Sequence, residues 1–339
     1  MLPPKLLPSK YMPLLDVLRF LAVVLVMMHH TNAVRLPGGG IGVDIFFAIS
    51  GFLIIGLLGE EYIKKGSINF LKFYGRRIIR LLPALWTMLA ITVFFIKPDL
   101  YTLISILFYF SNWLLASGHK IGFYGHTWSL SVEEQFYIVL PVILWVILKT
   151  SKVFGAKFKL VITIGLGILC SASVIGRVYL IWVGELDYAY NSTGARAGGF
   201  LLGGMAAIYA QEIQNCLRKF GLGILGAISL FFIFKYALTH HIYSETVDVI
   251  VIPFLCVFLV LWASTQNDKH FLNKKILVYP GTISYGIYLW HYPLIGLLPE
   301  IQPKFIFIVI FILSMAVASF SWHFIEKPFS RKFKPLFTV

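Results

Sequence analysis

An arginine and a histidine share one face of the first hydrophobic stretch of this 339-residue chain. Arg19 and His30 are eleven positions apart. In a helix this leaves them about 20° apart around the axis and about 16 Å apart along it. His29 lies about 80° to one side. The pattern has two interpretations: a snorkelling arginine with an interfacial histidine, or a pore-lining face with a general base at its outer end.

Three arginines occupy five positions in the stretch FYGRRIIRLLPALW. One interpretation is that Arg76, Arg77 and Arg80 are no more than positively charged anchors at the cytoplasmic membrane surface. Arginine rather than lysine, however, favours bidentate contacts with phosphate. A coenzyme A molecule carries a diphosphate and a 3′-phosphate, so we predict that this cluster binds acyl-CoA.

The stretch HTWSLSVEEQFYIVLP places two adjacent glutamates where a hydrophobic helix begins. One glutamate is enough to interact favourably with the positive end of a helix dipole. A second glutamate beside Trp128 and Tyr137 indicates a site instead. Glu133 and Tyr137 are four positions apart and share a helix face, whereas Glu134 points elsewhere.

Further polar residues lie in other apolar stretches, each with two interpretations. Asp44 is either a helix N-cap or a carboxylate that orients a histidine. Ser50 is interpreted as a packing residue. His291 is either a hydrogen-bonded core histidine or part of a site, and Arg196 is a cation at membrane depth.

Composition sets the fold class. The chain is 58% hydrophobic and only 13% charged, about half the charged fraction of soluble proteins. Long apolar stretches without period-two alternation predict an all-α polytopic transmembrane bundle and argue against a barrel. No polar stretch is long enough to form a separate soluble core, so we expect one integral-membrane domain over residues 1–339, with no fused soluble domain.

The net charge of +14 does not indicate nucleic-acid binding, because the basic residues are spread over short loops between apolar stretches. The three cysteines are far apart and predict no disulfide framework and no metal site.

We predict about ten spans and one ambiguous apolar stretch, 101–117, that dips into the membrane or lies at its surface. With this count, only Arg35, Lys97, Lys120 and Lys304 lie in loops on the outer side, so both termini are cytoplasmic. The expected spans are 13–33, 41–59, 78–97, 130–149, 159–183, 196–211, 220–239, 247–265, 280–299 and 304–325.

Taken together, these segments resemble the acyltransferase family 3 membrane proteins, the integral-membrane O-acyltransferases of cell-envelope glycans. The motifs occur in the family's order over about residues 13–330. They are Arg19-x10-His30, GVDIFFAISGFLI, RRIIRLLPALW, WSLSVEEQFY, ARAGGFLLGGMAA, ISYGIYLWHYPL and FIEKPF.

The resemblance implies transfer of an acyl group, by default acetyl from acetyl-CoA, to a carbohydrate or glycolipid hydroxyl at a bacterial cytoplasmic membrane. It implies His30 as catalytic base, with Glu133 or Asp44 holding its imidazole, and Arg19, Arg76, Arg77 and Arg80 as acyl-CoA contacts. Trp128, Tyr137, Arg196 and His291 are expected to support the substrates. A separate extracytoplasmic acyltransferase is a possible partner. The alternative is a multi-span transporter of a glycan precursor or small metabolite.

Overall fold

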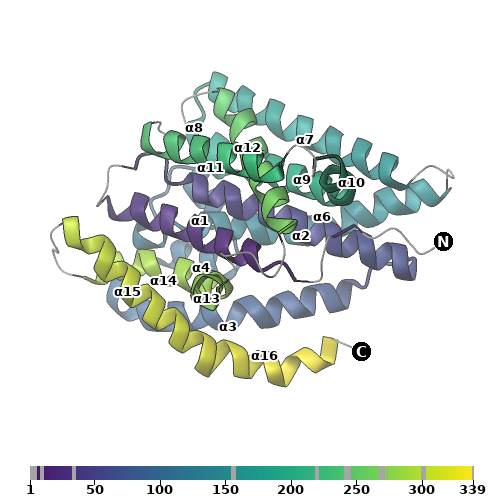
Figure 1. Ribbon diagram of the computed structural model, residues 1–339. Coiled ribbons are helices and arrows are strands. Elements are labelled where there is room, and N and C mark those ends of the chain that lie inside the picture. Colours follow the sequence, from purple (N-terminus) through teal and green to yellow (C-terminus); the bar gives the residue numbers. More distant parts are fainter. Residues whose placement is uncertain are drawn as a thin grey trace.

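The computed structural model describes residues 6–7, 11–32, 36–153, 158–217, 221–239, 246–266, 272, 274–298 and 303–337. Every regular element in these ranges is a helix. Six of the described helices are long and apolar enough to cross a membrane, and two shorter apolar helices cover Gly223–Thr239 and Asp248–Ser264. The predicted helical membrane bundle is therefore confirmed (Figure 1).

Each of the ten predicted spans overlaps a helix, while the number that cross the bilayer stays a prediction. The span predicted at 280–299 begins in one helix and continues in a second, because the helix is interrupted at Ile283. The longer helices are α1 (Pro13–Thr31), α2 (Ile41–Lys65), α3 (Phe70–Ile96), α6 (Thr127–Val153), α7 (Phe158–Trp182), α9 (Thr193–Ile208), α11 (Leu222–Thr239), α12 (Thr246–Ser264), α14 (Ser284–Leu297) and α15 (Pro303–Ser321). The shorter elements are α4 (Leu100–Leu107), α5 (Ser111–Ala116), η1 (Gly122–Tyr124), α8 (Leu186–Asn191), α10 (Ala210–Leu217), α13 (Lys275–Thr282), η3 (Trp322–Glu326), α16 (Lys327–Phe333) and η4 (Lys334–Phe337).

Glycines bring α2 and α9 into close contact at the centre of the bundle. A Cβ at Gly203 would lie 2.3 Å from the Ala48 carbonyl oxygen, and one at Gly51 would lie 1.9 Å from the Phe200 carbonyl oxygen. Only glycine allows the two backbones to approach so closely. The Gly-rich stretch that begins α9 thus forms a packing face and sets the position of Arg196 against α2.

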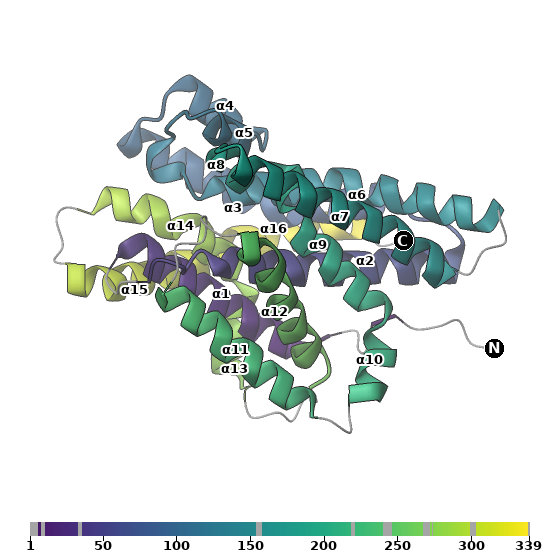
Figure 2. The same cartoon turned by 90° about the horizontal axis from the view of Figure 1, so that it is seen from above.

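The ambiguous stretch 101–117 forms α4 and α5, two helices too short to cross a bilayer separately. The side chain of Asp99 caps α4 by accepting a hydrogen bond from the Thr102 backbone N–H at 2.9 Å. Hydrogen bonds from Thr102 lower the pKa of the Asp99 carboxyl to about 2. Figure 2 shows α4, α5 and α8 together at one end of the molecule.

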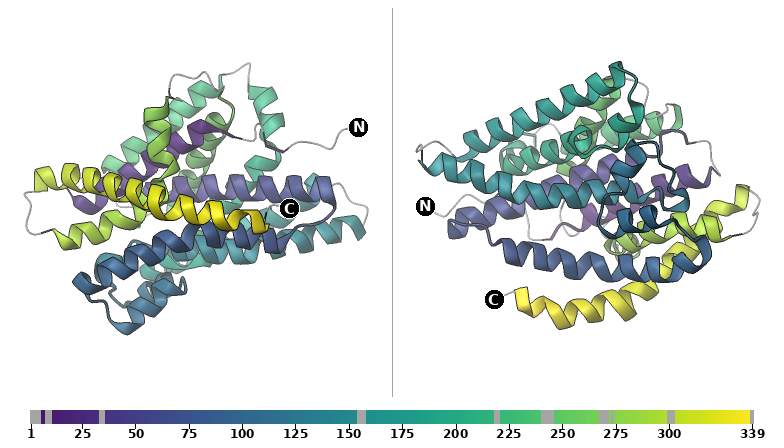
Figure 3. Two further views of the ribbon diagram at one scale, coloured as in Figure 1. Left: turned by 90° about the horizontal axis from the view of Figure 1, so that it is seen from below. Right: turned by 180° about the vertical axis from the view of Figure 1, so that it is seen from behind.

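The C-terminal helix continues past Glu326. A π-helical turn, η3, joins α15 to α16, and the C-terminal helices lie along α3 (Figures 1 and 3). The Glu326 carboxylate is buried and accepts a hydrogen bond from the Ser321 hydroxyl at 2.8 Å.

Candidate active site

A cavity of about 660 Å³ runs between α1, α2, α3, α6 and α14. Along α2 its lining extends from Val43 to Lys65, which at 1.5 Å per residue is about 33 Å. Lys64, Lys65 and Lys72 line one end, which we call the basic mouth. The cavity is therefore long and narrow, and it leads from charged residues toward the centre of the bundle.

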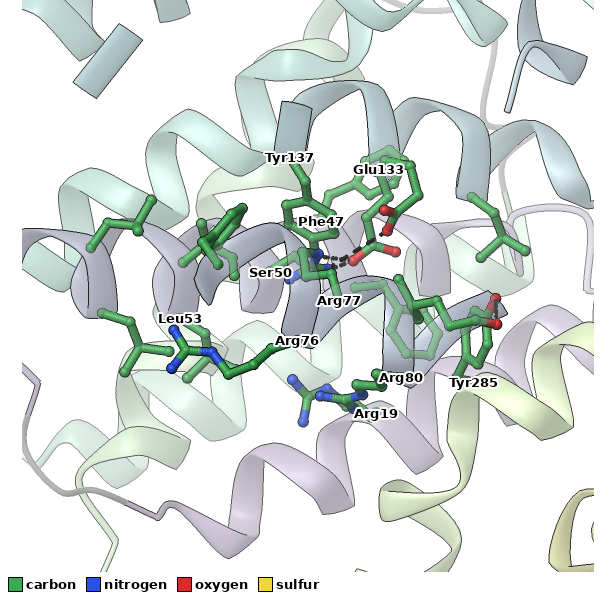
Figure 4. Close-up of a pocket in the computed structure, with 18 of the residues that line it drawn as sticks. Arg19, Phe47, Ser50, Leu53, Arg76, Arg77, Arg80, Glu133, Tyr137 and Tyr285 are labelled. Carbon is green, nitrogen blue, oxygen red and sulfur yellow. Dashed lines mark hydrogen bonds and ion pairs between the residues drawn. The ribbon is translucent and has the colours of Figure 1, made fainter. Parts of the chain in front are cut away.

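Four arginines line this cavity, as the sequence predicted for an anion-binding group. Arg76, Arg77 and Arg80 come from α3, and Arg19 comes from α1. Figure 4 shows the guanidinium groups of Arg19 and Arg80 side by side, with Arg76 extended toward Leu53. The cavity thus brings together two sequence segments about 60 residues apart. Adjacent like charges favour an anionic ligand.

The arginines differ in their partners. Arg19 Nη1 donates to Asp16 Oδ1 at 2.7 Å. Arg77 Nη2 lies 3.7 Å from Glu134 Oε1, and its guanidinium carbon lies 3.1 Å from the centre of the Tyr137 ring. Among the ion pairs of the described residues, none involves Arg76 or Arg80. Those two charges are the ones that a ligand can best neutralise.

Glu133 accepts two hydrogen bonds on one carboxylate oxygen at the middle of the cavity. The Ser50 hydroxyl donates to Glu133 Oε1 at 2.5 Å, and the Tyr137 hydroxyl donates to the same atom. The predicted shared face of Glu133 and Tyr137 is confirmed. The interpretation of Ser50 as a packing residue is wrong, since its hydroxyl lines the cavity and binds this carboxylate.

His30 and His291 form a hydrogen-bonded pair. His30 Nδ1 lies 2.8 Å from His291 Nε2, and the two rings are stacked with their centroids 5.1 Å apart. His291 is fully buried, and its Nδ1 lies 2.6 Å from the Tyr288 carbonyl oxygen.

This chain of contacts assigns the protons of the pair. A carbonyl oxygen only accepts, so His291 Nδ1 carries a hydrogen and donates it. In a neutral ring His291 Nε2 then accepts from His30 Nδ1–H. The remaining nitrogen, His30 Nε2, is left with a free lone pair, as a general base requires.

The predicted partner of His30 needs correction. Asp44 does not orient a histidine: its Oδ1 lies 2.9 Å from Arg196 Nη2, across the close α2–α9 contact. Asp44 is not the N-cap of α2 either, because that position is Gly40. Glu133 is engaged by Ser50 and Tyr137, so in the described residues the hydrogen-bond partner of His30 is His291.

The Asp44–Arg196 ion pair is enclosed by aromatic rings. Only 7% of the Asp44 side chain and 1% of the Arg196 side chain are exposed. The Arg196 guanidinium carbon lies 5.2–5.5 Å from the ring centres of Phe47, Trp128 and Tyr190. Trp128 and Arg196, expected to support the substrates, therefore contact each other.

The cavity stops one layer of side chains short of the histidine pair. Tyr288 and Ser129 line the cavity at its inner end, and we call these two residues the end wall. His30, His126 and His291 are not among the lining residues. Sequence reasoning missed both end-wall residues and also His126, whose ring centre lies 5.2 Å from that of His291. The signal available for His126 was its position at the start of the HTWSLSVEEQFY stretch.

Comparison with known proteins gives consistent matches. A family model described as an acyltransferase domain matches residues 13–324. The O-acetyltransferase OatA of Staphylococcus aureus is 29% identical over 360 residues, covering 97% of this chain and 58% of that protein. The peptidoglycan O-acetyltransferase OatA of Listeria monocytogenes is 32% identical over 355 residues, covering 94% of this chain and 56% of that protein. The chain thus spans less than two thirds of the length of these relatives. No solved structure matches it.

Proposed function

The chain belongs to the acyltransferase family whose model covers residues 13–324, and from this premise we propose that it transfers an acyl group from acyl-CoA to a carbohydrate hydroxyl. Membership confirms the family resemblance predicted from its motifs. The acyl-CoA donor, the carbohydrate acceptor and the residue roles below are parts of the proposal.

The observation that carries the proposal is the course of the cavity. It joins the arginines of α3 to the end wall, and the Tyr288 carbonyl in that wall binds His291, the partner of His30. An elongated donor with a phosphorylated head fits this arrangement. Its head lies against Arg19, Arg76, Arg77 and Arg80, and its acyl end points toward the end wall.

His30 is the proposed general base. His30 Nε2 takes the proton of the acceptor hydroxyl, and the oxygen attacks the thioester carbonyl carbon. The new C–O bond forms, the C–S bond breaks, and the proton passes from His30 to the sulfur of the leaving CoA. His291 fixes the tautomer that this step requires, the role a carboxylate has in other catalytic pairs.

Glu133 has a supporting role in the donor cavity. Its carboxylate is held by the hydroxyls of Ser50 and Tyr137, and Tyr137 also stacks against the Arg77 guanidinium. This network fixes Arg77 beside the donor path. No proton transfer is assigned to it.

The acceptor is proposed by likeness to the relatives. The Listeria relative is named a peptidoglycan O-acetyltransferase, and we propose a cell-envelope glycan hydroxyl as acceptor and acetyl as the acyl group. The basic mouth of the cavity faces the cytosol in this proposal, with both termini on the same side, because Lys and Arg concentrate there. The protein is then a multi-pass protein of the cytoplasmic membrane.

The test compares adjacent histidines. Purified wild type, His30→Ala and His29→Ala proteins are supplied with acetyl-CoA and an N-acetylglucosamine oligomer. CoA release and a mass increase of one acetyl group on the oligomer are then measured. His30→Ala is expected to lose about 10²–10⁴-fold in rate.

His29→Ala serves as the matched control, because His29 Nδ1 lies 3.1 Å from the Leu36 carbonyl oxygen and outside the His30–His291 pair. Its rate is expected to stay within a few-fold of wild type. Equal losses in the two variants, at equal levels of folded protein in the membrane, contradict the assignment. Absence of CoA release by wild type contradicts the proposed donor.

A further inference from the structure

Building on the proposed function, we infer that the end wall, Tyr288 with Ser129, is a size-selective barrier that restricts the transferred acyl group to short chains. The donor head lies at the arginines, so the acyl group is the part of the donor that meets this wall. The inference adds a specificity determinant to the proposed reaction.

The end wall is held firmly in place. The Tyr288 and Ser129 hydroxyl oxygens are 2.6 Å apart, and Tyr288 also donates to the His126 carbonyl oxygen at 3.0 Å. Ser129 reaches the same carbonyl oxygen at 3.2 Å. Both residues are only 4% exposed. Two hydroxyls sharing one acceptor therefore tie α14 to the start of α6.

The tyrosine ring has little room to move aside. The rings of His126 and His291 lie behind it, with centroid distances of 5.4 and 5.3 Å. The Phe46 ring packs edge-on at 6.1 Å. Displacing a buried ring among such neighbours costs packing as well as hydrogen bonds, and close-packed interiors do not deform smoothly.

The position of the end wall makes acyl size decisive. His30 lies beyond it, so the acyl carbonyl reaches the acceptor oxygen at His30 only when the acyl group displaces or passes Tyr288. An acetyl group requires the smallest displacement, and each added methylene requires more. Discrimination of about 10–200-fold per methylene is what a confined apolar site can provide.

The experiment measures kcat/KM for acetyl-CoA, propionyl-CoA and butyryl-CoA by CoA release in the presence of the N-acetylglucosamine oligomer. Wild type is expected to prefer acetyl over propionyl by about tenfold or more. Tyr288→Ala is expected to lower this ratio at least tenfold. Tyr288→Phe keeps the ring and is expected to retain most of the preference.

Tyr285→Ala is the matched control. Tyr285 lines the same cavity but lies near Arg80, with its hydroxyl donating to the Leu81 carbonyl oxygen at 3.2 Å (Figure 4). Removal of the Tyr285 ring is expected to change kcat/KM for all three donors by the same factor. If Tyr288 had only a structural role, its replacement would likewise change kcat/KM for all donors equally. The ratio of kcat/KM for acetyl-CoA to that for propionyl-CoA therefore distinguishes the two roles.

Ser129→Ala keeps the inference testable if Tyr288→Ala does not fold. It removes one hydroxyl from the end wall and is expected to lower the acetyl preference by a smaller factor. The inference is overturned if folded end-wall variants keep the wild-type ratio, or if wild type uses butyryl-CoA as well as acetyl-CoA. If wild type releases CoA from none of the three donors, the proposed function fails, which is a distinguishable outcome.

Discussion

Two groups of charged residues in this bundle are arranged in opposite ways. Asp44 and Arg196 form a matched pair, closed off by three aromatic rings and by the α2–α9 contact. The cavity instead brings the guanidinium groups of Arg19 and Arg80 side by side (Figure 4). The first group is an ion pair of opposite charges, whereas the second includes Arg80, which takes part in no ion pair of the described residues.

The difference separates charges that hold helices together from charges that bind the donor in the proposed function. A buried pair is satisfied within the protein, so removing one partner leaves an uncompensated charge in an apolar environment. A cluster of like charges at a cavity destabilises itself unless an anion arrives. Substitutions in the first group should therefore change stability, and substitutions in the second should change donor affinity.

The largest expected effect is on stability, in Asp44→Leu. This change removes the carboxylate that pairs with the buried Arg196 and should lower the free energy of unfolding by about 3–5 kcal/mol. The double variant Asp44→Leu/Arg196→Met should recover much of that loss, because apolar replacements remove both charges. Thermal unfolding of the purified proteins in detergent measures the loss in the single variant and the recovery in the double variant. A double variant no more stable than the single one would contradict a matched pair.

Arg80→Gln tests the other group. In the described residues Arg80 has no ion-pair partner, so the change should not lower the unfolding temperature. A lost charge-assisted contact with phosphate is worth about 1.5–3 kcal/mol, so KM for acetyl-CoA should rise about tenfold or more with kcat little changed. Steady-state kinetics measures this change in KM. A lowered unfolding temperature with an unchanged KM would contradict the assignment of Arg80 to donor binding.

Ionic strength should produce a smaller effect on the same group. The Debye length falls from about 10 Å at 0.1 M salt to about 3 Å at 1 M. Salt should therefore raise KM for acetyl-CoA severalfold in wild type and less in Arg80→Gln. Measuring KM of both proteins at the two salt concentrations checks this. Equal salt dependence in both would argue against Arg80 as a donor contact.

The smallest effect is expected at the basic mouth. The side chains of Lys64 and Lys65 are 57% and 59% exposed, and each pairs with a glutamate one helical turn earlier, Glu60 and Glu61 respectively. Such exposed pairs contribute about 0.3–0.5 kcal/mol. Lys64→Gln and Lys65→Gln should change KM for acetyl-CoA by less than about threefold. A change as large as that of Arg80→Gln would move the phosphate site toward the mouth.

The sequence predicted the helices and the composition of the cavity better than the pairings within the bundle. Hydropathy and charge placed each expected span on a helix, and helical spacing placed Glu133 beside Tyr137. Arg76, Arg77 and Arg80 line the cavity, as their clustering on one helix suggested. These features depend on local periodicity, which the sequence displays directly.

The pairings depend on which helices are neighbours, and periodicity does not determine that. Asp44 and Arg196 are 152 positions apart, and His30 and His291 are 261 positions apart. A histidine as the partner of His30 was therefore not predicted, and a carboxylate was expected instead. Ser50 and Tyr288 were missed for the same reason, since a hydroxyl in an apolar helix gains its role only from the side chain opposite.

The most direct test of the account compares binding of CoA with binding of pantetheine, which lacks the phosphates, to the purified full chain. The central claim is that the excess positive charge of the cavity binds the phosphorylated head of the donor. Two or more charge-assisted contacts predict that CoA binds at least about 100-fold more tightly than pantetheine and competes with acetyl-CoA. Equal affinities for the two compounds, or CoA binding that acetyl-CoA does not displace, would contradict it.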